Sequence, residues 1–521
     1  MSVNSLGESA VLALEFAPIA TALLLLFTLL AMPLGGCVRP PEVGQSALLG
    51  EVASPGDVEP LPVALAEPPS APAREGLIYE IYVRSFQDSD GDGIGDLRGV
   101  QRHLDYLAGL GVGTLWLLPV FPAFGPAGYD VTDFNRIRDE YGTAADLADL
   151  VAEAHARGMR VILDVPLNQV HRTHPWFEAL GVHPERFVLQ ARAPDGERWF
   201  PAGSPQSAYY GCFGADLPDL NWKDPGVRAA MFDVFRGWLA AGADGFRLDA
   251  VVMLVEEHGD TEGTAASHAV VADLYGAVKA ADPDAYVLAE ASEHDVDRSV
   301  SWLGTAGAPE SDAVLDFPRY EAFFEAVEAD PEALVGVVEA QGPAARSMAV
   351  FLASHDTDRL ATVLPDPRER RALRVVQFLL PGIPVVDYGD ELDQANDAAD
   401  TGEDLAMRGP MAWDDSNEGG FSASTAWFSA DPAYATVNVE AENRDPGSML
   451  ALIRSLAAVR RAAGEGVVFE DVGPAPVLAF TRGVGPNSVR VEVNLSGREL
   501  AGPWDLQPWA FRIEGASALP G

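Results

Sequence analysis

Carboxylates stand at the ends of several short apolar segments of this chain. Asp249 lies in GFRLDA two residues after Arg247, Glu290 ends AYVLAE, and Asp356 follows His355 in MAVFLASHD. Three carboxylates that converge from three strands are costly unless they serve charge that develops during a reaction. A guanidinium two residues from Asp249 lies on the same side of a strand and would keep that carboxylate ionised. In GFRLDA alone, an Arg–Asp pair that only stabilises a loop cannot be told from a catalytic one. The carboxylates of the other segments favour the catalytic interpretation.

The elements that must position these residues alternate along the chain. Helical spacing of apolar residues is found at residues 147–157, 227–241 and 368–380, between short β-rich segments. Eight such segments predict an α/β fold, a (β/α)8 TIM barrel, whose active site lies where the strands end. The eight are LIYEIYV, GTLWLLP, RVILDV, DGFRLDA, AYVLAE, DAVLDF, MAVFLAS and IPVVDYG.

The spacing of these segments also indicates how the chain divides. We expect the barrel over residues 76–463, with an inserted domain, domain B, at about 166–222 after the third strand, since a strand-to-helix loop is rarely that long. A helix at Met449–Ala463 closes the barrel region. The alternating segments of residues 464–521 predict a C-terminal β domain.

Composition and charge restrict the partners. Of the 521 residues 48% are hydrophobic and 22% charged, which is typical of a globular protein with a sizeable core. The formal net charge of −43 argues against nucleic acid, because a phosphate backbone is held by Lys and Arg clusters. We therefore expect a neutral or cationic partner.

The amino-terminal residues resemble a bacterial lipoprotein signal. A leucine-rich segment, Thr21–Met32, precedes LGGC, which ends at Cys37. This predicts a signal peptide at residues 1–36, lipidation of Cys37, a flexible linker at 37–75, and an exported protein anchored to the outer membrane or cell surface through its lipid. The first twenty residues contain no Lys or Arg, which departs from such signals, so an ordinary cleaved signal or a membrane anchor are the alternatives.

The barrel region resembles the α-amylase family of retaining glycoside hydrolases, family 13, in its oligosaccharide-acting or intermediate type. The resemblance runs from about Leu77 to Ala463 and rests on the order and spacing of GVGTLWLLP, GYD, LDVPLN, LPDLN, GFRLDA, AEAS, ASHD and PVVDYGDE. It implies that Asp249 is the nucleophile, Glu290 the general acid and base, and Asp356 the carboxylate that binds sugar hydroxyls. Two carboxyl groups in these roles cleave a glycosidic bond with retention.

The resemblance also implies residues that contact the sugar. Where the family has Asn-His at the end of the third strand, this chain has Asn168 and Gln169, and Gln cannot carry a positive charge. Turnover or specificity should differ accordingly. The implied substrate-binding set is Tyr129, Asp130, Asn168, Gln169, Arg247, His355 and Arg359.

A second acidic segment predicts a metal site. DSDGDGIGD spaces Asp residues at alternating positions between glycines, so that hard oxygen ligands could surround one Ca²⁺. It is similar to the calcium loop after the first strand in oligosaccharide-acting members of the family, and a solvated acidic turn is the alternative. The expected set is Asp88, Asp90, Asp92, Ile94 and Asp96.

The leading function from the sequence is hydrolysis of α-1,4-glucosidic bonds in starch, maltooligosaccharides or related α-glucans. Ala250 after the nucleophile favours this linkage, because family members that cut α-1,6 bonds commonly have Val there. The alternatives are an α-glucan transglycosylase, including one that makes a disaccharide such as trehalose, and an α-1,6-acting glucosidase or neopullulanase. A non-catalytic surface lipoprotein that binds glucan or a protein partner is a further alternative, disfavoured by the three retained carboxylates.

Overall fold

The structure is a computed structural model that describes residues 76–515, except 192–197, 205–206, 258–259, 328–329, 397–404, 472–475 and 503. The predictions for residues 1–75, with the signal, Cys37 and the linker, lie outside the described residues. No helix among the described residues has the length and apolar character needed to cross a membrane.

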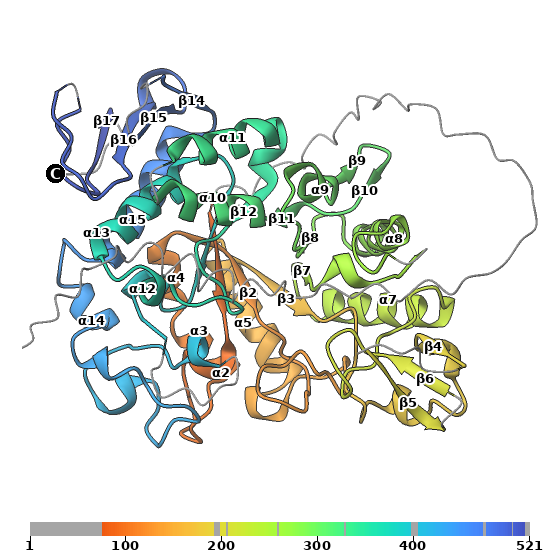
Figure 1. Cartoon of the computed structure of the whole chain (residues 1–521). Helices are drawn as coiled ribbons and strands as arrows, with labels where there is room; N and C mark the ends of the chain where they lie inside the picture. The colour runs from red at the N-terminus through yellow and green to blue at the C-terminus, as the bar shows by residue number, and fades with distance from the viewer. Residues whose placement is uncertain are drawn as a thin grey trace, which may run out of the picture.

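Eight parallel strands close into a barrel at the centre of the molecule (Figure 1). The order is β1-β13-β12-β11-β8-β7-β3-β2, and β1 pairs with both β2 and β13. Seven strands fall within the predicted segments and β2 begins one residue before its segment, at Val112, so the TIM-barrel fold is confirmed. The strands are β1 Leu77–Ile81, β2 Val112–Leu117, β3 Arg160–Val165, β7 Gly245–Leu248, β8 Tyr286–Ala289, β11 Ala313–Leu315, β12 Met348–Val350 and β13 Ile383–Asp387.

Helices surround the barrel, and several of them begin at side-chain caps. α5 starts after Thr143, which forms a capping box with Asp146, and Asp224 caps α7 directly before a proline. The sequence placed these helices two or three residues too late, because apolar spacing does not register the first turn. The helices are α2 Val83–Phe86, α3 Leu97–Arg102, α4 Leu104–Leu110, α5 Ala144–Ala156, α6 Pro175–Glu178, α7 Pro225–Ala240, α8 Ala265–Ala281, α9 Val296–Ser301, α10 Phe317–Val327, α11 Pro331–Gln341, α12 Leu360–Val363, α13 Pro367–Leu379, α14 Val439–Glu442 and α15 Met449–Ala463.

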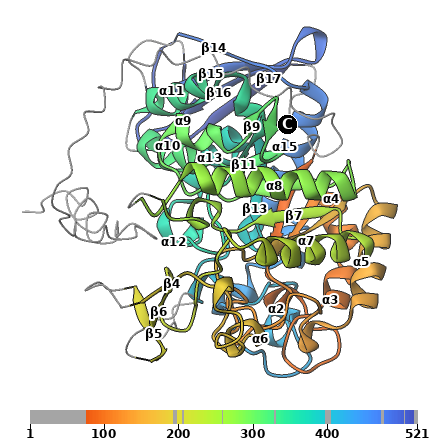
Figure 2. The ribbon, with the colours of Figure 1, turned by 90° about the vertical axis from the view of Figure 1, so that its right-hand side faces the viewer.

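Two small sheets stand outside the barrel. Between β3 and α7, β4 (Leu189–Gln190), β6 (Ser207–Tyr210) and β5 (Trp199–Ser204) form an antiparallel sheet, visible at one end of the molecule in Figure 2. β9 (Gly304–Thr305) and β10 (Ala308–Pro309) form a short hairpin.

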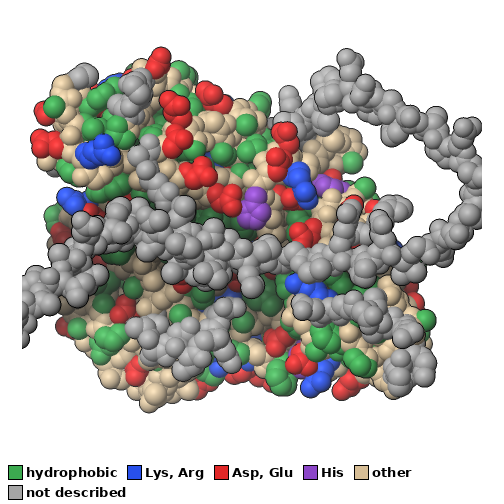
Figure 3. Space-filling model, viewed as in Figure 1, with side chains coloured by type: hydrophobic (Ala, Val, Ile, Leu, Met, Phe, Trp, Pro, Cys, Tyr) green, Lys and Arg blue, Asp and Glu red, His purple; other side chains and the backbone are tan. Residues whose placement is uncertain are grey.

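The carboxyl-terminal part forms a four-stranded antiparallel sheet. Its strands are β14 Val467–Phe469, β15 Val477–Arg482, β16 Val489–Asn494 and β17 Phe511–Gly515, in sequence order. Val489, Val491 and Val493 of β16 are fully buried and belong to the same apolar core as α13 and α15. On the face shown in Figure 3, acidic side chains dominate the upper part, with few Lys or Arg among them, in line with the negative net charge.

Candidate active site

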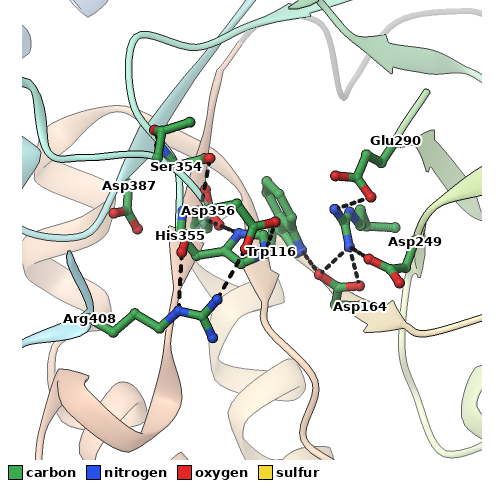
Figure 4. Close-up of polar contacts among 12 residues, drawn as sticks. Trp116, Asp164, Asp249, Glu290, Ser354, His355, Asp356, Asp387 and Arg408 are labelled. Carbon is green, nitrogen blue, oxygen red and sulfur yellow. Dashed lines mark hydrogen bonds and ion pairs between the residues drawn. The ribbon is translucent and has the colours of Figure 1, made fainter. Parts of the chain in front are cut away.

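The carboxyl ends of the barrel strands bring the predicted catalytic residues into two neighbouring groups, one around Arg247 and one around His355 (Figure 4). Arg247, in β7, is fully buried. Its Nη1 lies 2.5 Å from Oδ1 of Asp249 and 2.9 Å from Oδ1 of Asp164, and its Nη2 lies 2.8 Å from Oε2 of Glu290. One guanidinium therefore holds three carboxylates that come from the ends of three neighbouring strands, β3, β7 and β8.

The backbone after β7 adds a contact between the two carboxyl groups with predicted catalytic roles. Ala250 adopts a left-handed conformation, with φ 46° and ψ 42°, which is uncommon for a residue other than glycine. This turn directs its N–H toward Glu290, to which it donates a hydrogen bond of 2.9 Å. Glu290 is thereby fixed from two sides, by Arg247 and by the residue that follows Asp249.

The surroundings of Asp249 favour its ionised form less than the sequence indicated. Burial raises the pKa of Asp249 well above its ordinary value, and although Arg247 opposes this, the charges of Glu290 and Asp164 add to the increase. Arg247 alone therefore does not keep Asp249 ionised at low pH. The cluster contains more negative groups than the single guanidinium can balance.

A second group lies across the mouth of the barrel, around His355. Tyr129 Oη lies 2.6 Å from Nε2 of His355 and donates a hydrogen bond of 3.0 Å to Asp164. Nε2 of His355 also lies 3.1 Å from Oδ2 of Asp356, while Nδ1 contacts Glu80. Tyr129 thus links the His355 group to the Arg247 group.

Opposite charges stabilise the ionised forms in this second group. Burial disfavours the charged imidazole, but Asp356 and Glu80 outweigh it and raise the pKa of His355 to about 10. Burial also opposes ionisation of Asp356, yet His355 and Arg408 together lower the pKa of that carboxyl well below its ordinary value. Asp356 is therefore ionised at neutral pH, and its 47% exposed side chain can accept hydrogen bonds from the hydroxyl groups of a neutral ligand.

Sequence reasoning missed several residues of this site. Arg408 donates to the carbonyl of His355 and lies 3.1 Å from Asp356, but it follows a stretch without a motif. Glu80 lies inside the apolar segment of β1, where its side chain faces His355. Trp116 donates 3.0 Å to Asp164 and lies under the guanidinium of Arg247. These three residues are identified as part of the site by their contacts in the structure, and not by their local sequence.

The predicted sugar contacts near β3 lie at the same mouth. Gln169 is buried and its Nε2 donates 3.1 Å to the carbonyl of Tyr129, and its backbone bridges to Asp219. Asn168 is 1% exposed, and its side-chain amide has no hydrogen-bond partner in the part of the chain that the structure describes. Asp130 accepts 2.6 Å from the N–H of Gly125. Oε1 of Gln169 and Oδ1 of Asp130 likewise have no hydrogen-bond partner among the described residues, so all three side chains retain polar atoms that a ligand could bind.

Arg359, the last of the predicted sugar-contacting residues, lies against the end of β13. It is fully buried, donates 2.6 Å to the carbonyl of Tyr388, and lies 3.7 Å from Asp387 and 3.9 Å from Asp390. These contacts support the end of β13, and its predicted contact with a sugar stays a prediction.

The acidic loop after β1 gathers three of its predicted ligands. One carboxylate oxygen from each of Asp88, Asp90 and Asp96 lies within 4.8 Å of the others. Asp88 accepts hydrogen bonds from Ser422 at 2.6 Å and from the N–H of Gly91 at 2.7 Å. Three carboxylates at this spacing fit one hard cation such as Ca²⁺.

The other two members of that set lie differently. Asp92 is outside the group of three, and its carboxylate accepts 2.8 Å from the N–H of Ile94. Asp92 and Ile94 therefore stay predicted ligands only.

Comparison with known proteins agrees with this geometry. The family model "Alpha amylase, catalytic domain" matches residues 80–467. A trehalose synthase/amylase of Mycobacterium tuberculosis is 32% identical over 91% of this chain and 90% of its own, and an oligo-1,6-glucosidase of Parageobacillus thermoglucosidasius is 27% identical over 74% and 83%. The crystal structure of Bacillus licheniformis trehalose-6-phosphate hydrolase has a TM-score of 0.72 and 22% identity, and covers 82% of this chain and 91% of its own, which shows a shared fold.

Proposed function

Because the chain belongs to the α-amylase family of glycoside hydrolases, we propose that it is a retaining enzyme that transfers a glucosyl unit from an α-glucoside to a sugar acceptor, forming a trehalose-type disaccharide. The observation that carries the chemistry is the placement of Asp249 and Glu290 on one guanidinium, that of Arg247. The choice of transfer is supported by the relative named trehalose synthase/amylase, which matches about nine tenths of both chains. Among the readings of the sequence, this replaces starch hydrolysis as the leading one.

The first step breaks the bond to the leaving sugar. A carboxylate oxygen of Asp249 attacks the anomeric carbon while Glu290 gives its proton to the glycosidic oxygen, so the leaving sugar departs as a neutral alcohol and the glucosyl unit becomes an ester of Asp249. Asp356 and His355 would hold the sugar hydroxyls during this step. Positive charge that develops on the ring is balanced by the excess of carboxylates around Arg247.

The second step decides the product. Glu290, now a carboxylate, takes the proton of an acceptor hydroxyl, whose oxygen attacks the anomeric carbon and displaces Asp249. Two inversions restore the α configuration. When the acceptor is the anomeric hydroxyl of the departed glucose, the product is an α,α-linked disaccharide, and when it is water, the product is free glucose.

Hydrolysis of α-1,4 bonds is the second candidate. The name of the same relative includes amylase, and the residues required are identical, since only the acceptor changes. Cleavage of α-1,6 bonds is supported by the relative named oligo-1,6-glucosidase at lower identity. The non-catalytic alternative has less support, because a binder has no use for three mutually repelling carboxylates.

Product analysis separates these candidates. The full chain is incubated with maltose and, separately, with isomaltose, and products are resolved by anion-exchange chromatography and proton NMR. Trehalose from maltose supports the proposal, glucose alone supports hydrolysis, and glucose only from isomaltose supports the α-1,6 reading. Asp249→Ala should give no product, whereas Asp297→Asn, which removes an exposed carboxylate in α9, should match the parent chain. An absence of product with both sugars would overturn the enzymatic proposal.

We also propose that Ca²⁺ binds to Asp88, Asp90 and Asp96 in a structural role. The loop is tied through Asp88 to Ser422, which lies far away in the sequence, and a cation there would reinforce this connection between β1 and the segment after β13. The ion would take no part in proton or glucosyl transfer.

Export and lipid attachment through Cys37 stay predictions from the sequence. Metabolic labelling of a bacterial host with a fatty acid tests them, because label should enter the chain and be lost in Cys37→Ser. Unlabelled parent chain would contradict them.

A further inference from the structure

A charged cavity lies at the opposite end of the barrel from the active site. It is small, about 10 Å³, and lies between the residues that precede β13 and the C-terminal sheet. Gly382, directly before β13, lines it together with Arg346, Arg460, Glu465 and Arg482. The active site lies at the carboxyl ends of the strands, so this cavity is separate from the substrate-binding and catalytic residues.

The charges around this cavity do not balance. Arg346 and Glu465 form a half-exposed pair, 3.4 Å apart, at its rim. Arg460 and Arg482 are 8% and 2% exposed, and neither forms an ion pair with any residue between 76 and 515 that the structure describes. Glu465, already paired with Arg346, is the carboxylate that lines this cavity, so its one negative charge faces three guanidiniums.

The partners of the two guanidiniums are neutral. Arg460 donates 2.8 Å to the carbonyl of Phe378, and Arg482 donates 3.1 Å each to the carbonyls of Leu379 and Leu380, where α13 ends. The negative end of the helix dipole favours cations there, but only by a fraction of a full charge. Nε of Arg482 is buried and has no acceptor among the described residues.

The electrostatics reflect this shortage of negative charge. Burial lowers the pKa of Arg460 well below its ordinary value, and the neighbouring Arg482 lowers it further. Burial likewise lowers the pKa of Arg482 to about 10, against the opposing effect of Glu465. Both guanidiniums would gain from an anion at this place.

We propose that this cavity binds one small inorganic anion of the size of chloride, and that the anion fastens the C-terminal sheet to the amino-terminal end of the barrel. A volume of about 10 Å³ has room for about one water-sized particle, which excludes a sugar and favours a halide. The site joins β15, through Arg482, to α15, through Arg460, and to the loop before β13. Occupancy should therefore stabilise the fold and leave the catalytic steps unchanged.

The test varies the anion at a constant sodium concentration, because sodium alone is expected to stabilise a chain with a net charge of −43. Thermal unfolding of the full chain is followed as sodium gluconate is replaced by sodium chloride at fixed total sodium. The parent chain should show a saturable rise of the midpoint by about 3 °C. Glu465→Gln, which removes the negative charge at the rim, should reach saturation at several-fold lower chloride.

Two arginine variants complete the test. Arg346→Gln, at the half-exposed rim, should weaken the chloride response several-fold, whereas Arg461→Gln, an exposed neighbour of Arg460 in α15, should keep it. In crystals soaked with bromide, an anomalous peak should lie between Arg460 and Arg482. The proposal would be overturned by a thermal midpoint that does not respond to chloride, or that responds equally in Arg346→Gln, Glu465→Gln and the parent chain. The absence of bromide from the cavity would also overturn it.

Discussion

Arg247→Met removes a guanidinium that holds three carboxylates, and its effect on stability should depend on pH. Asp164, Asp249 and Glu290 lie 2.9, 2.5 and 2.8 Å from the guanidinium nitrogens. Breaking a buried ion pair by removing one partner costs about 3–5 kcal/mol. At pH 7 we expect a loss of this size in the free energy of unfolding, since methionine fills the space but leaves the carboxylates unbalanced.

The sign of the pH dependence follows from the carboxylates. Burial raises the pKa values of Asp164 and Asp249 in the folded protein above their unfolded values, despite the opposing charge of Arg247. A carboxyl group with a raised folded pKa costs stability above that pKa and none below its unfolded pKa. Without Arg247 both values rise further, so the deficit of the variant should be large at pH 7 and shrink as the pH falls toward 4.

Urea denaturation followed by tryptophan fluorescence, at pH 7 and pH 5, measures this deficit. Arg374→Met is the matched control, because Arg374 is also buried but pairs with a single carboxylate, Asp390, at 2.6 Å outside the site. Activity on α-glucosides should fall by on the order of 10³-fold in Arg247→Met, from the loss of the ionised nucleophile. An equal deficit at both pH values, or retained activity, would show that Arg247 does not balance these carboxylates.

Three further changes test other parts of the structure. Asp356 and Glu80 outweigh the effect of burial and raise the pKa of His355 to about 10. The charged His355 therefore contributes stability that is complete below pH 6.5 and is lost as the pH rises toward 10. His355→Gln should flatten this alkaline decline of the thermal midpoint, and an unchanged decline would count against the interaction of His355 with the two carboxylates. Calcium should raise the midpoint of the parent chain but not of Asp88→Asn, and an equal rise in both would exclude the loop as the site. Gln169→His should increase kcat/KM by about 10-fold by supplying a charged donor, whereas a decrease would mean that its bond to Tyr129 matters more.

The strands and the clustering of the carboxylates could be predicted from the sequence because each stands at a fixed point of a repeated pattern. Asp249 and Glu290 directly follow apolar segments, and a closed parallel barrel places all such ends at one mouth. No further information was needed to bring them together. The same holds for Asp88, Asp90 and Asp96, which are near in sequence and near in space.

The supporting residues could not be found in this way. Arg408 and Glu80 contact His355 across more than fifty and more than two hundred residues, and neither stands in a pattern that indicates charge pairing. The helix starts at Thr143 and Asp224 depend on single capping bonds, which apolar periodicity does not show. The raised pKa of Asp249 depends on burial and on the neighbouring Asp164, both properties of the assembled barrel.

The most direct test of the central claim traps the glucosyl unit on its carboxylate. Glu290→Gln, which cannot assist the second step, is incubated with 5-fluoro-α-D-glucosyl fluoride, whose fluoride leaves without a proton, and the digested chain is analysed by mass spectrometry. We expect one fluoroglucosyl unit on the peptide that contains Asp249, and none in Asp249→Ala. A unit attached to another carboxylate, or no unit on a chain whose parent form turns over α-glucosides, would contradict it.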